Sequence, residues 1–345
     1  MIWRNVCFSP QTPLKETIAR IDESRLQIGL VTDEAGHLLG VVTDGDLRRA
    51  MLKGVGLDVE TSAVMNANPK VLPAGASKEE LIAFMRRYMV HQVPLINPDG
   101  CLAGLAVLDE LIGAFDRPNW VVLMAGGLGT RLSPLTDDCP KPMLPVGGKP
   151  ILENIVESFI EQGFRRFFLS VNYKAEQIQS YFGNGDRWGI TVAYLHEDKR
   201  LGTAGALSLL PNAPEFPILV MNGDLLTRAN FKGMLDFHAE HASIATMAVR
   251  EYDILVPYGV VTLDGPRISS IKEKPVQSFF VNAGIYVISP ETLNFIPKNT
   301  FFDMPTLFEK LTEIGKKTTA FPLHEYWFDI GRLEEYQHVE QKWIV

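Results

Sequence analysis

Met124-Ala-Gly-Gly-Leu-Gly-Thr-Arg-Leu-Ser-Pro-Leu-Thr136, which continues to Pro140-Lys-Pro-Met-Leu-Pro145, is the stretch that decides the fold. The apolar run 120–124 leads into it and predicts a buried strand. The glycines that follow leave out side chains where a phosphate would need close access to backbone N–H groups. Their spacing is neither G-x-G-x-x-G nor G-x-x-x-x-G-K-[ST], which excludes a Rossmann fingerprint and a P-loop. The pattern predicts a phosphate-binding turn, with a plain strand-to-helix turn as the alternative.

Two fixed positive charges, Arg131 and Lys141, accompany the glycines, and four prolines stiffen the return of the chain. The full string G-G-x-G-T-R-L-x-P-L-T, followed by P-K-P, resembles the signature of the sugar-1-phosphate nucleotidyltransferases. The resemblance implies catalytic roles for Arg131 and Lys141. It also implies nucleotide contacts from the loop residues Gly126, Gly127, Gly129 and Thr130.

Length and composition fit a globular protein of two domains. The chain has 345 residues, of which 46% are hydrophobic and 21% charged, with a net charge of −8. The acidic balance argues against a nucleic-acid-binding surface, and no apolar run is long enough to cross a membrane. The three cysteines lack metal-site spacing, and no signal peptide is recognisable, so we expect free thiols in the cytoplasm.

Residues 1–117 contain an internal repeat. Apolar spacing predicts helix, strand, strand and helix at 14–24, 27–31, 38–42 and from 46, and again at 78–88, 92–96, 102–107 and from 109. Two such units resemble a pair of CBS domains, a smaller α/β module that often binds adenine nucleotides. The resemblance implies a ligand site at Thr43 and Asp46, whereas Val107 and Glu110 depart from the pattern in the second copy. A structural dimerisation module is the alternative, with Asp46 only a helix N-terminal carboxylate.

From residue 118 onward, strands and helices alternate, which predicts an α/β fold with a Rossmann-like, mainly parallel or mixed sheet. Strands are expected at 120–124, 167–171, 191–195, 218–221, 245–250, 259–263, 268–272 and 283–288. Helices are expected at 151–162, 174–182, 203–210, 231–241 and from 332. We place the boundary at the turn-prone segment 115–119, between a CBS pair (1–117) and a nucleotidyltransferase domain (118–345).

Two aspartates stand at apolar strands. Asp224 follows the run 218–221, and Asp329 lies among aromatic residues in Tyr326-Trp-Phe-Asp-Ile-Gly. A carboxylate in so apolar a run is costly unless it is paired or metal-bound, although each alone could be a turn or cap residue. The two stretches match the family's N-G-D and W-x-D-x-G, and the resemblance implies that both aspartates bind Mg²⁺.

Further motifs resemble the sugar side of the family's site. Ile271-Lys-Glu-Lys-Pro falls on E-K-P, which implies that Glu273 meets sugar hydroxyls and that Lys274 meets the sugar phosphate. Asn282, in the string N-A-G-I-Y, and Gly259 match two further sugar contacts. The simpler alternatives are a solvated lysine and an ordinary buried strand amide.

Gly202 opens the predicted helix 203–210, whose N-terminal amides could line the nucleoside site. In the resembling thymidylyl- and uridylyltransferases a glutamine stands five residues earlier, where this chain has Glu197. An ionised carboxylate only accepts hydrogen bonds, and guanine offers two adjacent donors. Glu197 therefore predicts GTP as the donor. A solvated loop residue, and a UTP- or CTP-dependent enzyme, remain the alternatives.

The sequence as a whole predicts an enzyme that transfers GMP from GTP to a sugar 1-phosphate and releases pyrophosphate. Arg131 would neutralise the β- and γ-phosphates, Lys141 the charge near the α-phosphate, and Lys274 would orient the nucleophile, with no side-chain nucleophile needed. Mannose, glucose, a hexosamine or a heptose stay open as the sugar. We expect a homo-oligomer without nucleic-acid or membrane partners. The rival hypothesis is a regulatory subunit that senses nucleotides without turnover.

Overall fold

The computed structural model describes residues 2–112 and 116–342. Its first part consists of η1 (Ile2–Val6), β1 (Cys7–Phe8), α1 (Leu14–Ser24), β2 (Ile28–Thr32), β3 (Leu38–Thr43), α2 (Asp44–Leu52), η2 (Thr61–Ala63), β4 (Leu72–Pro73), α3 (Lys78–Tyr88), β5 (Gln92–Ile96), β6 (Leu102–Val107) and α4 (Leu108–Ile112). The predicted repeat is present as two three-stranded sheets, β1-β2-β3 and β4-β5-β6. In each sheet the first two strands are parallel and the last two antiparallel.

Capping boxes set where two of these helices begin. Thr43 caps α2 and Ser77 caps α3, each together with an acidic residue three positions later. Helix α2 therefore starts at Asp44, two residues before the predicted start, because the Thr43 hydroxyl accepts a hydrogen bond from the Asp46 N–H. Asp46 therefore acts as a carboxylate at the N-terminus of α2, which is the role that the structural alternative predicted. The resemblance to CBS domains places a ligand at the same residue.

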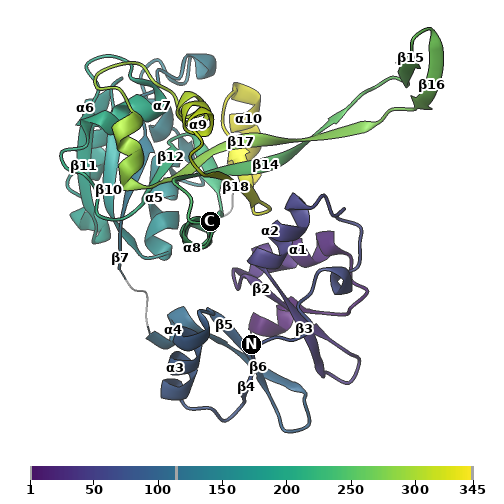
Figure 1. The fold of residues 1–345 in the computed structure, drawn as a ribbon. Helices are drawn as coiled ribbons and strands as arrows, with labels where there is room; N and C mark the ends of the chain where they lie inside the picture. The colour runs from purple at the N-terminus through teal and green to yellow at the C-terminus, as the bar shows by residue number, and fades with distance from the viewer. Residues whose placement is uncertain (1, 113–115, 343–345) are drawn as a thin grey trace.

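The second part holds the larger α/β body (Figure 1). Its strands are β7 (Arg117–Met124), β8 (Pro145–Val146), β9 (Lys149–Pro150), β10 (Phe164–Val171), β11 (Thr191–His196), β12 (Ile218–Asn222), β13 (Leu225–Thr227), β14 (Ala245–Leu255), β15 (Val260–Asp264), β16 (Arg267–Lys272), β17 (Val276–Ile288), β18 (Thr318–Leu323) and β19 (Trp327–Asp329). Its helices are η3 (Thr130–Leu132), η4 (Lys141–Met143), α5 (Ile151–Glu161), α6 (Ala175–Phe182), η5 (Asp186–Trp188), α7 (Gly202–Gly205), η6 (Ala206–Leu209), α8 (Phe231–Glu240), η7 (Pro290–Phe295), α9 (Met304–Glu313) and α10 (Leu333–Lys342).

The central sheet has the order β11-β10-β7-β12-β17-β14-β18. The strands β11, β10, β7 and β12 are mutually parallel, and β17 alone runs antiparallel to both its neighbours. The predicted mainly parallel sheet is therefore confirmed. Since β7, β10 and β12 end at one edge, the loops that follow them meet there.

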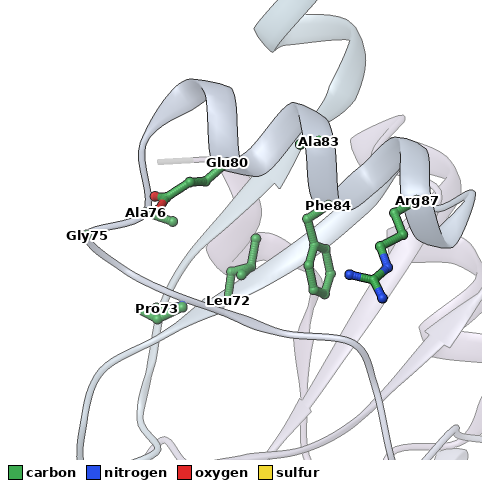
Figure 2. A pocket seen from close by; sticks show the side chains of 8 residues that line it. All are labelled: Leu72, Pro73, Gly75, Ala76, Glu80, Ala83, Phe84 and Arg87. Atoms are coloured by element: carbon green, nitrogen blue, oxygen red, sulfur yellow. The ribbon is translucent and has the colours of Figure 1, made fainter.

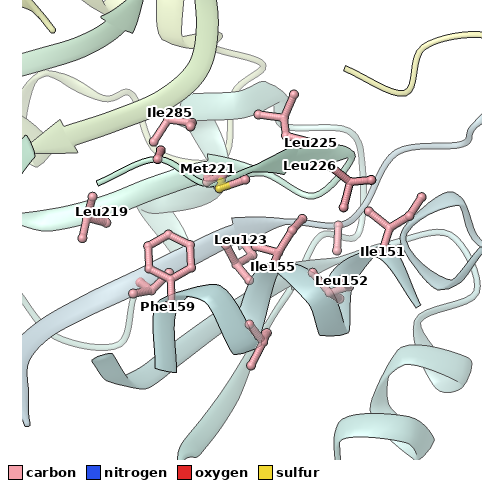
Figure 3. Packing of buried hydrophobic residues seen from close by; sticks show 14 of the residues in the cluster. Leu123, Ile151, Leu152, Ile155, Phe159, Leu219, Met221, Leu225, Leu226 and Ile285 are labelled. Atoms are coloured by element: carbon pink, nitrogen blue, oxygen red, sulfur yellow. The ribbon is translucent and has the colours of Figure 1, made fainter. Parts of the chain in front are cut away.

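Alternate residues of the central strands enter two separate cores. Leu123, Leu219 and Met221 belong to the core under α5, α6, α8 and α10, and Figure 3 shows the part of this core next to α5. Val122 and Val220 face the opposite way, into the core under α7 and α9. Helices cover both faces of the sheet. Ligands of such folds bind outside the carboxyl ends of the parallel strands, so we expect the active site there.

The largest differences between the observed and the predicted elements are at three places. β7 begins at Arg117, because this residue pairs with Phe164, so part of the predicted turn 115–119 is strand and its beginning lies outside the described residues. The predicted helix 203–210 is a short α-helix, α7, followed by the 3-10 turn η6. β14 and β17 continue far beyond the predicted 245–250 and 283–288.

The first CBS repeat packs on the transferase body through α2. The Arg48 guanidinium donates to the Pro322 carbonyl and to Glu325 Oε1, the latter at 2.7 Å. Asn230, the N-cap of α8, donates to Asp44 Oδ2 at 2.8 Å. Arg48 and Glu325 are both buried. Among the described residues, no helix has the length and apolar character needed to cross a bilayer.

Candidate active site

The glycine-rich loop leaves β7 at the edge where the parallel strands end. A Cβ at Gly126 would lie 3.0 Å from Glu197 Oε1, so the glycine lets this carboxylate approach the loop. Gly129 has a φ of 65°, and a Cβ there would lie 2.9 Å from Thr136 Cγ2. The Thr136 hydroxyl also donates to the Gly129 carbonyl at 2.9 Å. The loop is thus folded tightly onto the segment that leads to Lys141.

A group of charges lies directly beside this loop. Lys141 is buried, and its Nζ donates a hydrogen bond to Asp224 Oδ2. β19 pairs with β13 so that Asp329 stands opposite Leu225, next to Asp224 in the chain. Asp329 is exposed at the end of β19, but partial desolvation by its surroundings raises its pKa, and the Asp224 carboxylate raises it further. Lys141 and Arg131 oppose that rise, so four charged residues far apart in the sequence lie within one electrostatic neighbourhood.

The donor set at this edge fits a divalent cation. The carboxylates of Asp224, in the turn before β13, and of Asp329, at the end of β19, repel each other, and Mg²⁺ binds hard oxygen donors of this kind. Asn222 Oδ1 is buried without a hydrogen-bond partner among the described residues, two positions before Asp224. Buried polar atoms without a protein partner are typical of a site that binds a polar or charged ligand.

Glu197 is held at the carboxyl end of β10 and does not project freely into solvent. The Ser170 hydroxyl donates to its Oε1 at 2.6 Å, and the Leu201 N–H donates to its Oε2 at 2.9 Å. The Asn172 side-chain amide donates to its backbone carbonyl. A solvated loop residue is therefore not what the structure shows. Each carboxylate oxygen retains further acceptor capacity.

Three backbone N–H groups at the start of α7 already have partners within the chain. The N–H of Thr203 donates to Asp303 Oδ1 at 3.0 Å. The N–H groups of Ala204 and Gly205 donate to the Phe302 carbonyl. Gly202 has a φ of 77°, and a Cβ there would lie 2.5 Å from Asp303 Oδ1. The loop before α9 thus engages three of these amides, and a nucleoside contact from Gly202 stays a prediction.

The four predicted sugar-binding residues fall into two places. Gly259 and Glu273 are neighbours, since a Cβ at Gly259 would lie 2.8 Å from Glu273 Oε2, and Lys274 follows directly. All three lie on the outer part of the β14–β17 hairpin. Asn282 lies at its base, where its amide donates to the Tyr286 hydroxyl at 2.8 Å and its Oδ1 accepts from the Gly284 N–H. The structure does not bring the two groups together.

The predicted CBS ligand residues are engaged with each other. Asp46 Oδ2 accepts from the Thr43 N–H and hydroxyl at 2.9 and 2.7 Å, and its Oδ1 accepts from Arg49 at 2.7 Å. A pocket of about 600 Å³ lies instead between β4 and α3 of the second repeat (Figure 2). It is lined by Leu72, Pro73, Gly75, Ala76, Glu80, Ala83, Phe84 and Arg87.

Among the described residues, one further group has the spacing of a metal site: Asp44, His324 and Glu325. Arg48 lies within it, 2.7 Å from Glu325 Oε1 and 3.4 Å from Asp44 Oδ2. Its guanidinium already supplies the positive charge that a cation would bring. This group is therefore an ion-pair cluster, which we call the junction cluster (Asp44, Arg48, His324, Glu325).

Sequence reasoning missed three polar residues of the site, Ser170, Asn172 and Asn222. All stand at the carboxyl end of β10 or β12. The general rule that ligands bind outside these strand ends was the signal that could have found them. A serine or an asparagine alone carries too little chemistry to stand out in a sequence.

Comparisons with known proteins agree with this architecture. Residues 120–344 match the family model described as nucleotidyl transferase, and residues 1–53 and 60–117 match that of the CBS domain. A UTP–glucose-1-phosphate uridylyltransferase from Synechocystis sp. is 33% identical over 235 residues, which cover 62% of this chain and 61% of the relative. The catalytic subunit beta of mannose-1-phosphate guanylyltransferase from Danio rerio is 35% identical over 224 residues, 62% of each chain. The chain thus spans about three fifths of the length of these relatives.

Among solved structures, HddC from Yersinia pseudotuberculosis is similar with a TM-score of 0.52 and 30% identity, covering 65% of this chain and 99% of that one. The same protein complexed with GMP-PN gives a TM-score of 0.51 at 28% identity, again covering 65% and 99%. The family match covers the whole larger body, including the glycine-rich loop and both aspartates. The chain therefore belongs to the nucleotidyl transferase family and carries a pair of CBS domains ahead of its transferase domain.

Proposed function

We propose that this protein transfers a nucleoside monophosphate, GMP from GTP, to a sugar 1-phosphate. The observation that carries the proposal is the convergence of Arg131, Lys141, Asp224 and Asp329 beside the glycine-rich loop. A binding-only domain has no need of this combination. Uridylyl- and guanylyltransferases of sugar 1-phosphates among the relatives support the reaction class.

The reaction needs charge neutralisation and positioning more than covalent help. An oxygen of the sugar phosphate attacks the α-phosphorus of the nucleotide, the bond to the β-phosphate oxygen breaks, and pyrophosphate leaves. Arg131 would bind the β- and γ-phosphates, and Lys141 would turn from Asp224 toward the α-phosphate. A magnesium ion, when bound, neutralises the phosphate oxygens, and Asp224 and Asp329 are the residues that would hold it.

Base selection rests on Glu197. Ser170 and Leu201 fix both carboxylate oxygens beside the glycine-rich loop, which orients the acceptor edge. Guanine can donate from N1–H and its 2-amino group to such an edge, whereas uracil and thymine offer one N–H between two carbonyl oxygens. The similar structure complexed with GMP-PN and the guanylyltransferase relatives agree with a guanine nucleotide. We propose a cytoplasmic location, since Cys7, Cys101 and Cys139 form no disulfide.

One screen tests this function. Pyrophosphate release is measured for five nucleoside triphosphates against a panel of hexose, hexosamine and heptose 1-phosphates, with Mg²⁺ present. We expect turnover, with GTP the preferred donor. A lead for UTP or CTP would sink the guanine assignment alone. Nucleotide binding without pyrophosphate from any pair would favour the regulatory-subunit hypothesis.

The CBS pair has its own test. We propose that an adenine nucleotide binds at Thr43 and Asp46, which stand where β3 passes into α2. Millimolar AMP, ADP or ATP should then raise the melting temperature of the full chain by mass action, and Asp46→Ala should reduce that shift. An equal shift in both proteins would favour the structural role of Asp46 as a capping residue.

A further inference from the structure

The outer part of the β14–β17 hairpin projects from the body as a two-stranded arm, residues 250–281, with β15 and β16 at its tip (Figure 1). Its ladder continues without a second bulge from Val249↔Asn282 to Leu255↔Val276. Every residue of β16 and the last five of β14 are exposed. A two-stranded ribbon is at best marginally stable in water, so an arm of this length calls for something to pack against.

One face of the tip is apolar, and the opposite face is mainly polar apart from Val260. Val261 pairs with Ile271, and Leu263 pairs with Ile268, so these four side chains share a face. They are between 46% and 62% exposed. An antiparallel sheet with one apolar face commonly packs that face against another surface. The paired part of the arm formed by β14 and β17 has exposed apolar residues on both faces: Tyr252 pairs with Phe279 on one face, and Leu255 pairs with Val276 on the other.

The arm also carries three residues to which the sequence assigns sugar-binding or catalytic roles. Glu273 and Lys274 follow β16, and Gly259 precedes β15. The base of the arm lies at the catalytic edge, since a Cβ at Gly284 would lie 2.7 Å from Asn222 Nδ2. From Asn282 out to Val276 the strand runs about 20 Å at about 3.3 Å per residue. Lys274 is therefore carried away from the Asp224 centre of its own chain.

We propose that the arm belongs to the active site of a second copy of this chain. Each arm would lay its apolar face on the partner body and bring Gly259, Glu273 and Lys274 to the partner's Lys141 and Asp224. A return of the arm to its own body would require the continuous ladder to open, whereas reciprocal exchange keeps it intact and closes a two-fold dimer. This inference rests on the proposed function for the role of Lys274, but the dimer itself does not.

The test is complementation within one dimer. Lys274→Ala damages the arm and Asp224→Asn damages the body. The two full-length variants are co-expressed with different affinity tags, and the mixed dimer is isolated through both tags. With exchanged arms, one site of the mixed dimer combines an intact body with an intact arm, so about half of the wild-type activity should return. If each arm serves its own body, both sites carry a damaged part and the mixed dimer stays inactive, which overturns the proposal.

Two controls separate this idea from the proposed function. Lys272→Ala, on the exposed strand β16, is the control for Lys274→Ala. It should be as active as the wild type without a second, complementing chain. Sedimentation equilibrium does not depend on activity: the wild type should be a dimer, and Val261→Ser with Ile271→Ser should shift it toward monomer. If the wild type showed no turnover but its dimer still depended on Val261 and Ile271, the proposed transferase function would be wrong and the arm exchange would be supported. A monomeric wild type would sink the exchange.

Discussion

The junction cluster and the active site are both built from acidic and basic side chains, but they use them in opposite ways. In the junction cluster, Arg48 lies between the carboxylates of Asp44 and Glu325, and Asn230 supplies further hydrogen bonds. At the active site, Lys141 has Asp224 as its ion-pair partner, and Arg131 is exposed. The guanidinium and carboxylates of the junction cluster are paired inside the protein, whereas at the active site Arg131 and Asp329 are exposed to a charged ligand beside the buried Lys141.

Charged residues that hold two parts of the chain together and charged residues that bind a ligand look alike in a sequence, and the structure distinguishes them. Buried and mutually compensated charges fix how two parts of the chain sit together, and removing one partner leaves the other unpaired. Open charges at a sheet edge contribute little to stability and much to binding and catalysis. The two regions are also close in the chain, since Glu325 and Asp329 lie four positions apart.

The largest expected effect is on the junction cluster. Arg48→Met leaves Glu325 and Asp44 buried without their guanidinium, which should cost about 3–5 kcal/mol of unfolding free energy. Denaturant unfolding measures the loss. Arg49→Met, on the same helix but pairing at the surface, should cost at most about 1 kcal/mol. Equal losses in the two variants would contradict the contrast between buried and open charges.

The next effect is on turnover. Asp224→Asn and Asp329→Asn should each lower kcat by on the order of a hundredfold, about 2.7 kcal/mol, because they remove interactions strongest in the transition state. The melting temperature should change little. Glu215→Gln, in an exposed loop, is the matched control. Near-normal turnover of both aspartate variants at saturating Mg²⁺ would remove the catalytic role from this pair.

The third effect, smaller than the first two, is on the preference for the nucleotide base. Glu197→Gln should lower kcat/KM for GTP by about 2 kcal/mol, the scale of a lost charged hydrogen bond, and narrow its lead over UTP. Steady-state kinetics with both nucleotides checks this. Asp198→Asn removes one negative charge from the exposed residue next to Glu197. It should leave the ratio of kcat/KM for GTP and UTP unchanged. An unchanged GTP-to-UTP ratio in Glu197→Gln would show that the base is selected elsewhere.

The smallest effect is a pH dependence of the junction cluster. Burial lowers the pKa of His324, but the carboxylates of Glu325 and Asp44 outweigh it and hold the pKa above its usual value. The resulting stabilisation is complete below the unfolded pKa of about 6.5 and is lost as pH rises through the folded pKa. Nearby, burial and Glu325 raise the pKa of Asp22 to about 6, which acts in the same direction.

His324→Gln should therefore flatten the decline of melting temperature above about pH 6.5, and Asp22→Asn should flatten the decline between about pH 4 and pH 6, the interval between the unfolded and folded pKa of that carboxyl. Arg48 keeps its charge throughout this range. Thermal unfolding between acidic and alkaline pH compares the variants with the wild type. A decline as steep in His324→Gln as in the wild type would mean that the imidazole does not titrate in this window.

Local patterns predicted the parts of the molecule that local interactions decide. The strand before the glycine-rich loop, the repeat in residues 1–117 and the aspartates at strand ends follow from apolar periodicity and short motifs. The junction cluster could not be predicted, because Arg48 and Glu325 are 277 positions apart. The length of β17 was missed because Phe279 and Phe280 lie in a segment with no core of its own to reveal a period. The occupied amides of α7 depend on Asp303, again a long-range contact.

The central claim is that the open charges at the sheet edge carry out nucleotidyl transfer. Phosphorus NMR of the enzyme with GTP, a sugar 1-phosphate and Mg²⁺ tests it most directly, because it follows every phosphate at once. We predict that a nucleotide sugar and pyrophosphate form in equal amounts, and that neither forms once the metal is chelated. Release of GDP and inorganic phosphate, or no change in GTP with any sugar 1-phosphate, would contradict the account.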